Sequence, residues 1–291
     1  MAATTTHSPA VTRWYIRPSL VMTITLTVFV AVVAVAWLYP LVCIVGLTFN
    51  RLDALMPALT FVPKIFTSDV YTRLVTTYHL EKYVLNTLNV AFGSAILTVF
   101  SATLAGYAVG KMKFKGRELI FYFILSTMLL PAQATLAPTF VLYRKLHLLN
   151  THLGLILPAL GGGAYNIFLM RQFMLRLPDE ILDAGRIDGC NEFGLFRLLV
   201  LPNMLGPVLV LGTLAINGAW TQLIGPQIFI FDLEKQLIMP AILSINQAGV
   251  ADPYAYVATI AAATLVTLLP VGIYGYSQRH FMSALAGAIK G

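Results

Sequence analysis

The sequence has few charged residues, and this scarcity excludes a soluble globular protein. Asp, Glu, Lys and Arg make up only 11% of its 291 residues, whereas 58% are hydrophobic and the mean hydropathy is +0.80. A soluble domain carries about 25% charged residues. The composition therefore predicts an integral membrane protein. Its two cysteines, Cys43 and Cys190, lie far apart, which argues against a disulfide framework and against a cysteine-based metal site.

Ionisable side chains are also missing from the long apolar stretches. All 12 carboxylates and all five His residues fall outside them, whereas transporters driven by protons or sodium usually keep such a group inside the membrane. The segment "GYAVGKM" (106–112) has a shortened glycine spacing and Met112 in place of the magnesium-binding Ser or Thr of a phosphate loop. It is more typical of a small-xxx-small helix contact.

No catalytic motif, metal cluster or basic cluster is present, so we expect neither an enzyme nor a nucleic-acid-binding protein, despite the net charge of +7. We expect no cofactor on this chain. Primary transport by such a chain would therefore need a nucleotide site on a partner.

Six stretches are long and apolar enough to cross a bilayer, which needs about 20 residues per helix. They are residues 19–48, 84–110, 119–142, 153–170, 206–230 and 253–277. The predicted fold is therefore an all-α integral membrane domain with six transmembrane helices over 19–277. It has an N-terminal tail (1–18), an outer loop (50–83), a cytoplasmic loop (171–205) and a C-terminal tail (278–291).

The distribution of Lys and Arg predicts the orientation of these helices. With the N-terminus inside, twelve of the 19 Lys and Arg residues fall on the cytoplasmic side, among them those of "KMKFKGRE". Cytoplasmic loops carry such an excess. Both termini and the 171–205 loop are thus predicted to be cytoplasmic, with lipid around the spans.

The 171–205 loop predicts two short helices. Pro178 suits a first helical turn, and Asp179 and Glu180 favour its positive end. The first helix should end at Asp188-Gly189, where Gly can adopt a left-handed cap. Asn191 is a good N-cap for the second helix, which should end at Leu201-Pro202. Its apolar stripe is expected at i, i+3 and i+7: Phe193, Phe196 and Val200.

"EILDAGRIDGCNEFGLFRLLVLP" resembles the EAA loop of ABC-importer permeases. The resemblance places Asp183, Ala184 and Gly185 on the Glu-Ala-Ala triplet and Asp188-Gly189 on the Asp-Gly pair. The aromatic position falls on Phe196 and the Leu-Pro on Leu201-Pro202. Two residues depart from the pattern, because Asp183 stands for Glu and Gly185 for Ala.

In that family the loop is a coupling helix held in a groove of the ATPase subunit. The resemblance therefore implies ATPase-coupling roles for a set of residues in this loop: Glu180, Asp183, Ala184, Gly185, Asp188, Gly189, Phe193 and Phe196. Small residues at 184 and 185 would let another surface approach the backbone closely.

Further stretches are similar to six-span permeases of maltose-type carbohydrate uptake, including "NTLNVAFGSAILTVFSATLAGYAVGKMKFKGRELI" and the terminal "QRHFMSALAGAIKG". This resemblance implies a type I importer in the bacterial inner membrane. Its partners would be a second, different permease, two ATPase subunits that hold ATP and magnesium, and an extracytoplasmic solute-binding protein.

An uncharged sugar needs amide partners and aromatic faces on its route. The membrane-depth candidates are Asn86, Tyr165, Asn166, Asn217, Trp220 and Thr221, of which the last three share one helix face. Each of them is also compatible with a simple contact between helices. Gly161-Gly162-Gly163 suggests a break in the fourth span.

Other functions stay open. The cargo of the same kind of importer can be a polyol, a glycerophosphate or an acidic oligosaccharide, although an anionic cargo favours Arg or Lys within the spans and none is predicted there. A self-sufficient secondary transporter or channel is the alternative from a different class.

Overall fold

The structure is a computed structural model that describes residues 19–49, 66–248 and 253–289, and every regular element in these ranges is helical. The longer helices are α1 (Leu20–Thr48), α3 (Leu80–Lys111), α4 (Arg117–Ser126), α5 (Ala132–Lys145), α7 (Ala164–Met174), α11 (Leu205–Trp220), α13 (Ile238–Ala248) and α14 (Pro253–Ile289). The shorter elements are α2 (Asp69–Thr76), η1 (Thr127–Leu129), α6 (His152–Ile156), η2 (Leu157–Gly161), α8 (Asp179–Ile187), α9 (Glu192–Leu195), η3 (Phe196–Val200), α10 (Leu201–Asn203), α12 (Ile224–Phe229) and η4 (Leu233–Lys235).

Four helical stretches in the described residues are long and apolar enough to cross a membrane on their own. They are Leu20–Thr48, Leu80–Lys111, His152–Met174 and Tyr254–Gln278. Two bent pairs raise the number to six if each pair counts as one span: α4–η1 with α5, bent by 97°, and Glu192–Asn203 with α11, bent by 80°.

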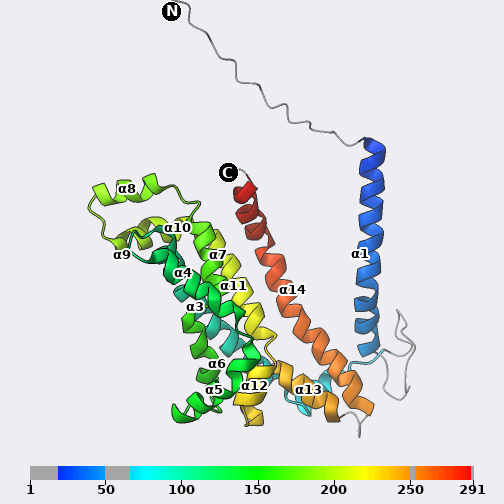
Figure 1. Ribbon diagram of the computed structural model, residues 1–291. Helices are drawn as coiled ribbons and strands as arrows, with labels where there is room; N and C mark the ends of the chain where they lie inside the picture. The colour runs from blue at the N-terminus through cyan, green and yellow to red at the C-terminus, as the bar shows by residue number, and fades with distance from the viewer. Residues whose placement is uncertain (1–18, 50–65, 249–252, 290–291) are drawn as a thin grey trace, which may run out of the picture.

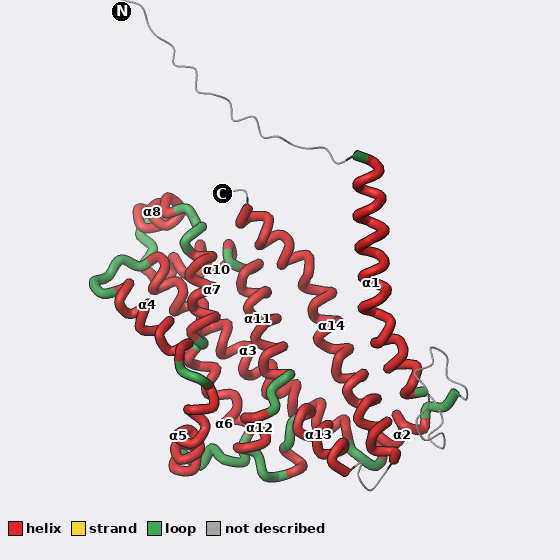
Figure 2. The backbone as a smooth tube through the Cα atoms, turned by 45° about the vertical axis from the view of Figure 1, so that its right-hand side comes forward, coloured by secondary structure: helices red, strands yellow, loops and turns green. Residues whose placement is uncertain are grey.

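The elements gather at two ends of the molecule (Figure 1). The start of α1, the end of α14 and the short helices α8, α9 and α10 lie at one end, which we call the α8 end. At the opposite end lie α5, α6, α12 and α13, and Figure 2 shows α2 there as well. The start of α1 and the end of α14 therefore lie at the same end as the 171–205 loop, and the cytoplasmic placement of the termini stays a prediction.

The "GYAVGKM" stretch is a close helix contact. Gly106 and Gly110 lie one turn apart on α3 and face Met170 and Met174, one turn apart on α7. A Cβ added at Gly106 would lie 2.7 Å from the Met170 Cβ, and one at Gly110 would lie 3.1 Å from the Met174 Cβ. The stretch is therefore the predicted small-xxx-small contact between two helices and has no room to hold a phosphate.

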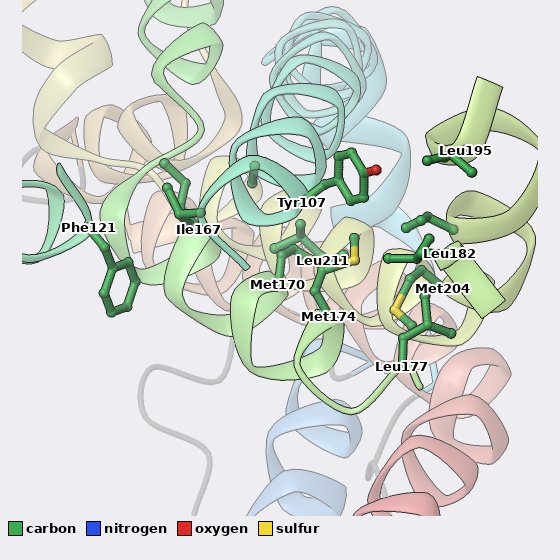
Figure 3. Packing of buried hydrophobic residues seen from close by; sticks show 13 residues of the cluster. Tyr107, Phe121, Ile167, Met170, Met174, Leu177, Leu182, Leu195, Met204 and Leu211 are labelled. Atoms are coloured by element: carbon green, nitrogen blue, oxygen red, sulfur yellow. The ribbon is translucent and has the colours of Figure 1, made fainter. Parts of the chain in front are cut away.

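Three buried clusters fix the fold. One lies at the α8 end and joins α3, α7 and α11 to the 171–205 segment (Figure 3). A second surrounds Trp220, whose Nε1 donates to the Val266 carbonyl at 3.2 Å and so links α11 to α14. A third, around Tyr143 and Phe229, holds α5 and α6 to α12.

The helices do not follow every predicted stretch. The 119–142 stretch is not one helix, because Pro131 forces Leu130 into an extended conformation (φ −79°, ψ 121°) and the chain turns there. The 206–230 stretch is interrupted between α11 and α12. The predicted 278–291 tail is helical as far as Ile289, as a continuation of α14. The 1–18 tail and residues 50–65 of the outer loop lie outside the described residues.

Candidate functional site

The 171–205 segment folds as two helices joined by a tight turn. Asp188 ends α8, Gly189 takes φ +85°, and the Cys190 N–H donates to the Gly185 carbonyl at 3.0 Å. The Gly189 N–H donates to the Arg186 carbonyl, so both hydrogen bonds of a Schellman motif are present. The predicted left-handed glycine cap is confirmed.

Asn191 begins the second helix as predicted. Its Oδ1 accepts from the Gly194 N–H at 2.8 Å. The predicted end at Leu201-Pro202 was wrong, because the chain stays helical as far as Asn203. Pro202 sits at the start of α10, where its missing N–H costs little, and the residues before it form a π-helical turn, Phe196–Val200.

One face of the segment is packed against the membrane helices. Leu182, Leu195 and Val200 are fully buried, and Figure 3 shows Leu182, Leu195 and Met204 gathered on the side of Met174. The apolar stripe is therefore not the predicted one. Val200 belongs to it, but Phe193 is 68% exposed.

Gly185 serves this internal packing. A Cβ at residue 185 would lie 2.6 Å from methyl carbons of both Leu195 and Leu199. The surface that approaches the backbone here is therefore the chain's own second helix, whereas the sequence suggested an external partner. Ala184, the next residue, is exposed and leaves the backbone of α8 open to a partner.

The opposite face of the segment is exposed, acidic and partly apolar. Its candidate coupling residues are Glu180, Asp183, Ala184, Asp188 and Gly189, to which the structure adds Ile187 at 87% exposure. Phe193, the remaining exposed candidate, instead lines a hollow of about 870 Å³ together with residues of α3, α11 and α14. Asp183 accepts from Arg186 Nη1 at 2.8 Å, so its carboxylate already has a partner one turn away. Phe196 lies between the two faces, half-buried, with its ring centroid 5.5 Å from that of Tyr107.

Two side chains of α3 hold the segment by polar contacts that the sequence did not reveal. The Tyr107 hydroxyl donates to Glu192 Oε2 at 2.7 Å. The buried Lys111 ammonium donates to the Leu177 carbonyl at 2.5 Å and to Asp179 Oδ1 at 2.6 Å. The hydrogen bond and the positive charge of Lys111 hold the pKa of Asp179 below its ordinary value of 3.8.

These contacts left only weak signals in the sequence. In the sequence, Lys111 is only one more cation on the predicted cytoplasmic side, and Glu192 is only an acidic residue in the first turn of a helix. Tyr107 and Glu192 are 85 residues apart along the chain, so no local pattern joins them.

A third polar contact supports the same end of the molecule. Arg171 on α7 donates to both carboxylate oxygens of Glu118 at 2.9 Å and to the Val109 carbonyl at 3.1 Å. Its guanidinium carbon lies 4.0 Å from the ring centroid of Phe121. α3, α4 and α7 are thus tied together where the chain enters the 171–205 segment.

The candidate pathway residues do not form one site. Asn86 lies at the opposite end, where its Nδ2 donates to the carbonyls of Glu234 (2.8 Å) and Gln236 (3.0 Å). Asn166 donates to the Gly162 carbonyl at 2.9 Å, beside the predicted break, where Gly162 and Gly163 both have positive φ.

Tyr165, the other candidate on α7, is 53% exposed. Asn217, Trp220 and Thr221 do lie together at the end of α11. Trp220, however, is 2% exposed and packs against α14, so it offers no open ring face to a sugar, contrary to our expectation. Asn217 and Thr221 are exposed, and the Thr221 hydroxyl donates to the Asn217 carbonyl. A hollow of about 370 Å³ between α11 and α14 is lined in part by Asn217 and Trp220.

Among the described residues, no group of three or more His, Cys, Asp or Glu side chains is placed to hold a metal ion.

Comparison with known proteins gives consistent matches over most of the chain. Residues 102–282 match the family described as "Binding-protein-dependent transport system inner membrane component". The chain is 30% identical over 278 residues to the arabinooligosaccharides transport system permease protein AraQ of Bacillus subtilis (strain 168), covering 92% of this chain and 96% of AraQ. It is 31% identical over 207 residues to the sn-glycerol-3-phosphate transport system permease protein UgpE of Salmonella typhi, covering 71% and 73% of the two chains.

A solved structure has the same fold. A chain of a bacterial ABC transporter involved in the import of the acidic polysaccharide alginate aligns with a TM-score of 0.75 at 20% identity, covering 93% of this chain and 100% of that one.

Proposed function

Because this chain belongs to the family of inner membrane components of binding-protein-dependent transport systems, we propose that it forms half of the pathway of an ATP-driven importer for a sugar or oligosaccharide. It is a multi-pass membrane protein and a transport component, not an enzyme. The observation that carries the proposal is the family match over residues 102–282, because it includes the 171–205 segment with its exposed acidic face.

The proposed assembly contains a second, different permease, two ATPase subunits and an extracytoplasmic solute-binding protein. This chain crosses the membrane six times, with each bent pair counted as one span and with the α8 end in the cytoplasm. The excess of Lys and Arg on that side supports this orientation. ATP and magnesium are held by the ATPase subunits.

The proposed mechanism is alternating access driven through the exposed face of α8. Closure of the ATPase subunits on ATP displaces α8, and the buried contacts of Leu182 and Leu195 transmit the displacement to α3, α7 and α11. Interiors are close-packed and transmit strain, so the helices move with the segment. The cargo biases the equilibrium only through different contacts in the inward- and outward-facing states.

A neutral carbohydrate is the proposed cargo. Support comes from the likeness to AraQ, whose name gives arabinooligosaccharides, and from the absence of Lys and Arg in the six apolar stretches. Asn217 is the best-placed amide, because it is exposed and lines the hollow between α11 and α14. The likeness to UgpE keeps a glycerophosphate as the second candidate.

Two glycines with nearly the same positive φ test the coupling role. Gly189 (φ +85°) and Gly116 (φ +84°) have no atom within 4 Å of an added Cβ, so valine strains only the backbone at either position. A left-handed conformation costs a residue with a side chain about 1–2 kcal/mol or more. Both variants should insert and assemble with their partners in vesicles.

Only Gly189→Val, in the coupling segment, should lower ATP-driven uptake, by about fivefold or more. Normal uptake by this variant, or an equal loss in Gly116→Val, would count against the coupling role of α8.

A secondary transporter would accumulate sugar without any partner subunit, whereas the importer hypothesis predicts that the isolated chain does not. The purified chain alone in vesicles should accumulate no sugar under a proton or sodium gradient, because the six apolar stretches contain no carboxylate or His to bind the ion. Accumulation in that experiment would replace the importer hypothesis.

A further inference from the structure

We propose that Glu192 is a positioning residue for coupling, and that with Tyr107 and Lys111 it fastens both ends of α8 to the membrane helix α3. This inference rests on the proposed function, since it names the contacts that make α8 move together with α3. Tyr107 and Lys111 are buried and Glu192 is half-buried, so these three side chains are set back from the exposed face of α8 that an ATPase subunit would touch.

Glu192 joins three helices through one carboxylate. Its Oε2 accepts from the hydroxyl of Tyr107, on α3, at 2.7 Å. Its Oε1 accepts from Arg186, on α8, with Nη2 at 3.2 Å and Nε at 3.4 Å. Glu192 itself is the first residue of α9. Because both oxygens have partners in different helices, the carboxylate fixes the last turn of α8 relative to α3.

Lys111 makes the second attachment at the other end of α8. Its ammonium donates to the Leu177 carbonyl at 2.5 Å and to Asp179 Oδ1 at 2.6 Å, and Asp179 is the first residue of α8. Tyr107 and Lys111 are four residues apart on α3, so they lie on one face of that helix, one turn apart. One face of α3 therefore holds the beginning of α8 directly and its end through Glu192.

The two polar attachments fix the angle of α8 to α3, which the apolar cluster alone does not fix. The packing of Leu182 and Leu195 holds the segment against α3, α7 and α11, but hydrophobic contacts have no preferred direction and do not by themselves fix the angle of α8 to α3. Hydrogen bonds that involve an ionised group are directional and about twice as strong as neutral ones. With one attachment α8 can pivot about it, whereas with two it keeps its angle to α3. A push on α8 then becomes a displacement of α3.

The test uses the complete importer in vesicles and measures sugar molecules transported per ATP hydrolysed. Tyr107→Phe removes a single hydroxyl from a buried ring, and Lys111→Met removes the ammonium at similar length. The matched controls are Tyr122→Phe, on the exposed side of α4, and Lys113→Met, in the loop after α3. The amount of assembled complex and its thermal midpoint are measured for each variant.

We expect Tyr107→Phe and Lys111→Met each to lower the transport-to-hydrolysis ratio about fivefold or more, with ATP hydrolysis and assembly retained. The controls should keep the wild-type ratio. Tyr107→Phe should have no further effect when added to Glu192→Ala, because both changes remove the same contact. Glu192→Gln should fall between wild type and Glu192→Ala, since its amide oxygen still accepts from Tyr107.

Two results would overturn the inference: a wild-type ratio in Tyr107→Phe, or a loss of uptake that merely follows a loss of assembled complex. If Gly189→Val uncouples transport and Tyr107→Phe does not, only the role of the Glu192 contact fails. If neither variant changes the ratio, the coupling role of the whole 171–205 segment fails with it.

Discussion

Alanine at Gly106 should destabilise the protein more than alanine at any open helical glycine. The new Cβ would lie 2.7 Å from the Met170 Cβ and 3.2 Å from the backbone nitrogen of Arg171, so α3 and α7 must separate. Overpacking of this kind costs about 1–3 kcal/mol. Replacing a helical glycine also returns about 0.5–1 kcal/mol of backbone entropy, which leaves a net loss of up to about 2.5 kcal/mol.

Gly218, on α11, is the matched control because nothing lies within 4 Å of its added Cβ. Gly218→Ala should be neutral or stabilising by about 0.5–1 kcal/mol. For a chain of this size 1 kcal/mol corresponds to about 2–4 °C in the thermal midpoint. The two variants should therefore differ by several degrees when unfolding of the purified protein in nanodiscs is followed by tryptophan fluorescence.

The clash at Gly106 involves a Cβ, so Met170→Ala, which keeps its Cβ, should not rescue Gly106→Ala. Equal midpoints for Gly106→Ala and Gly218→Ala, or rescue by Met170→Ala, would refute the close α3–α7 contact.

Three other outcomes are expected. Lys111 lowers the pKa of Asp179, so the stabilisation from their contact is complete above about pH 3.8 and is lost as the pH falls through the lowered pKa. Hydrogen exchange at the start of α8 should show this loss in the wild type, and Lys111→Met, which lacks the contact, should not show it. Asn86→Ala should lower the thermal midpoint, because two carbonyls lose their donor, while the affinity for sugar stays unchanged; a selective change in affinity would return Asn86 to the pathway. Asn217→Ala should do the reverse, raising the sugar concentration for half-maximal uptake at a wild-type midpoint, and an unaltered uptake curve would remove Asn217 from the pathway.

Features set by local chemistry were predictable from the sequence. The left-handed turn at Gly189 and the cap at Asn191 each depend on a few adjacent residues. The contact at Gly106 and Gly110 follows from small residues one turn apart in an apolar helix.

Features set by tertiary contacts were not predictable. Hydropathy measures how apolar a stretch is and not its direction, so it gave residues 119–142 as one stretch although the chain bends there by 97°. Pro131 signals a kink in the sequence but not how large the bend is. Helical spacing placed Trp220 and Asn217 on the same face of α11. That face is wide, so Trp220 lies in the buried contact with Val266 while Asn217 lies at the hollow between α11 and α14. The burial of Gly185 required knowing where Leu195 and Leu199 return in space.

The first helix has a consequence for how the protein sits in its lipid. α1 contains 29 residues, so it is about 44 Å long, while the hydrocarbon core of a bilayer is about 30 Å thick. Only 6% of its apolar window is buried within the chain, and its buried residues, Cys43, Leu47 and Thr48, are confined to its last turns. Because α1 is packed against the rest of the chain at one end only and is longer than the hydrocarbon core is thick, it can relieve hydrophobic mismatch by tilting. As long as no other subunit packs against α1, the thickness of the surrounding bilayer sets its tilt angle.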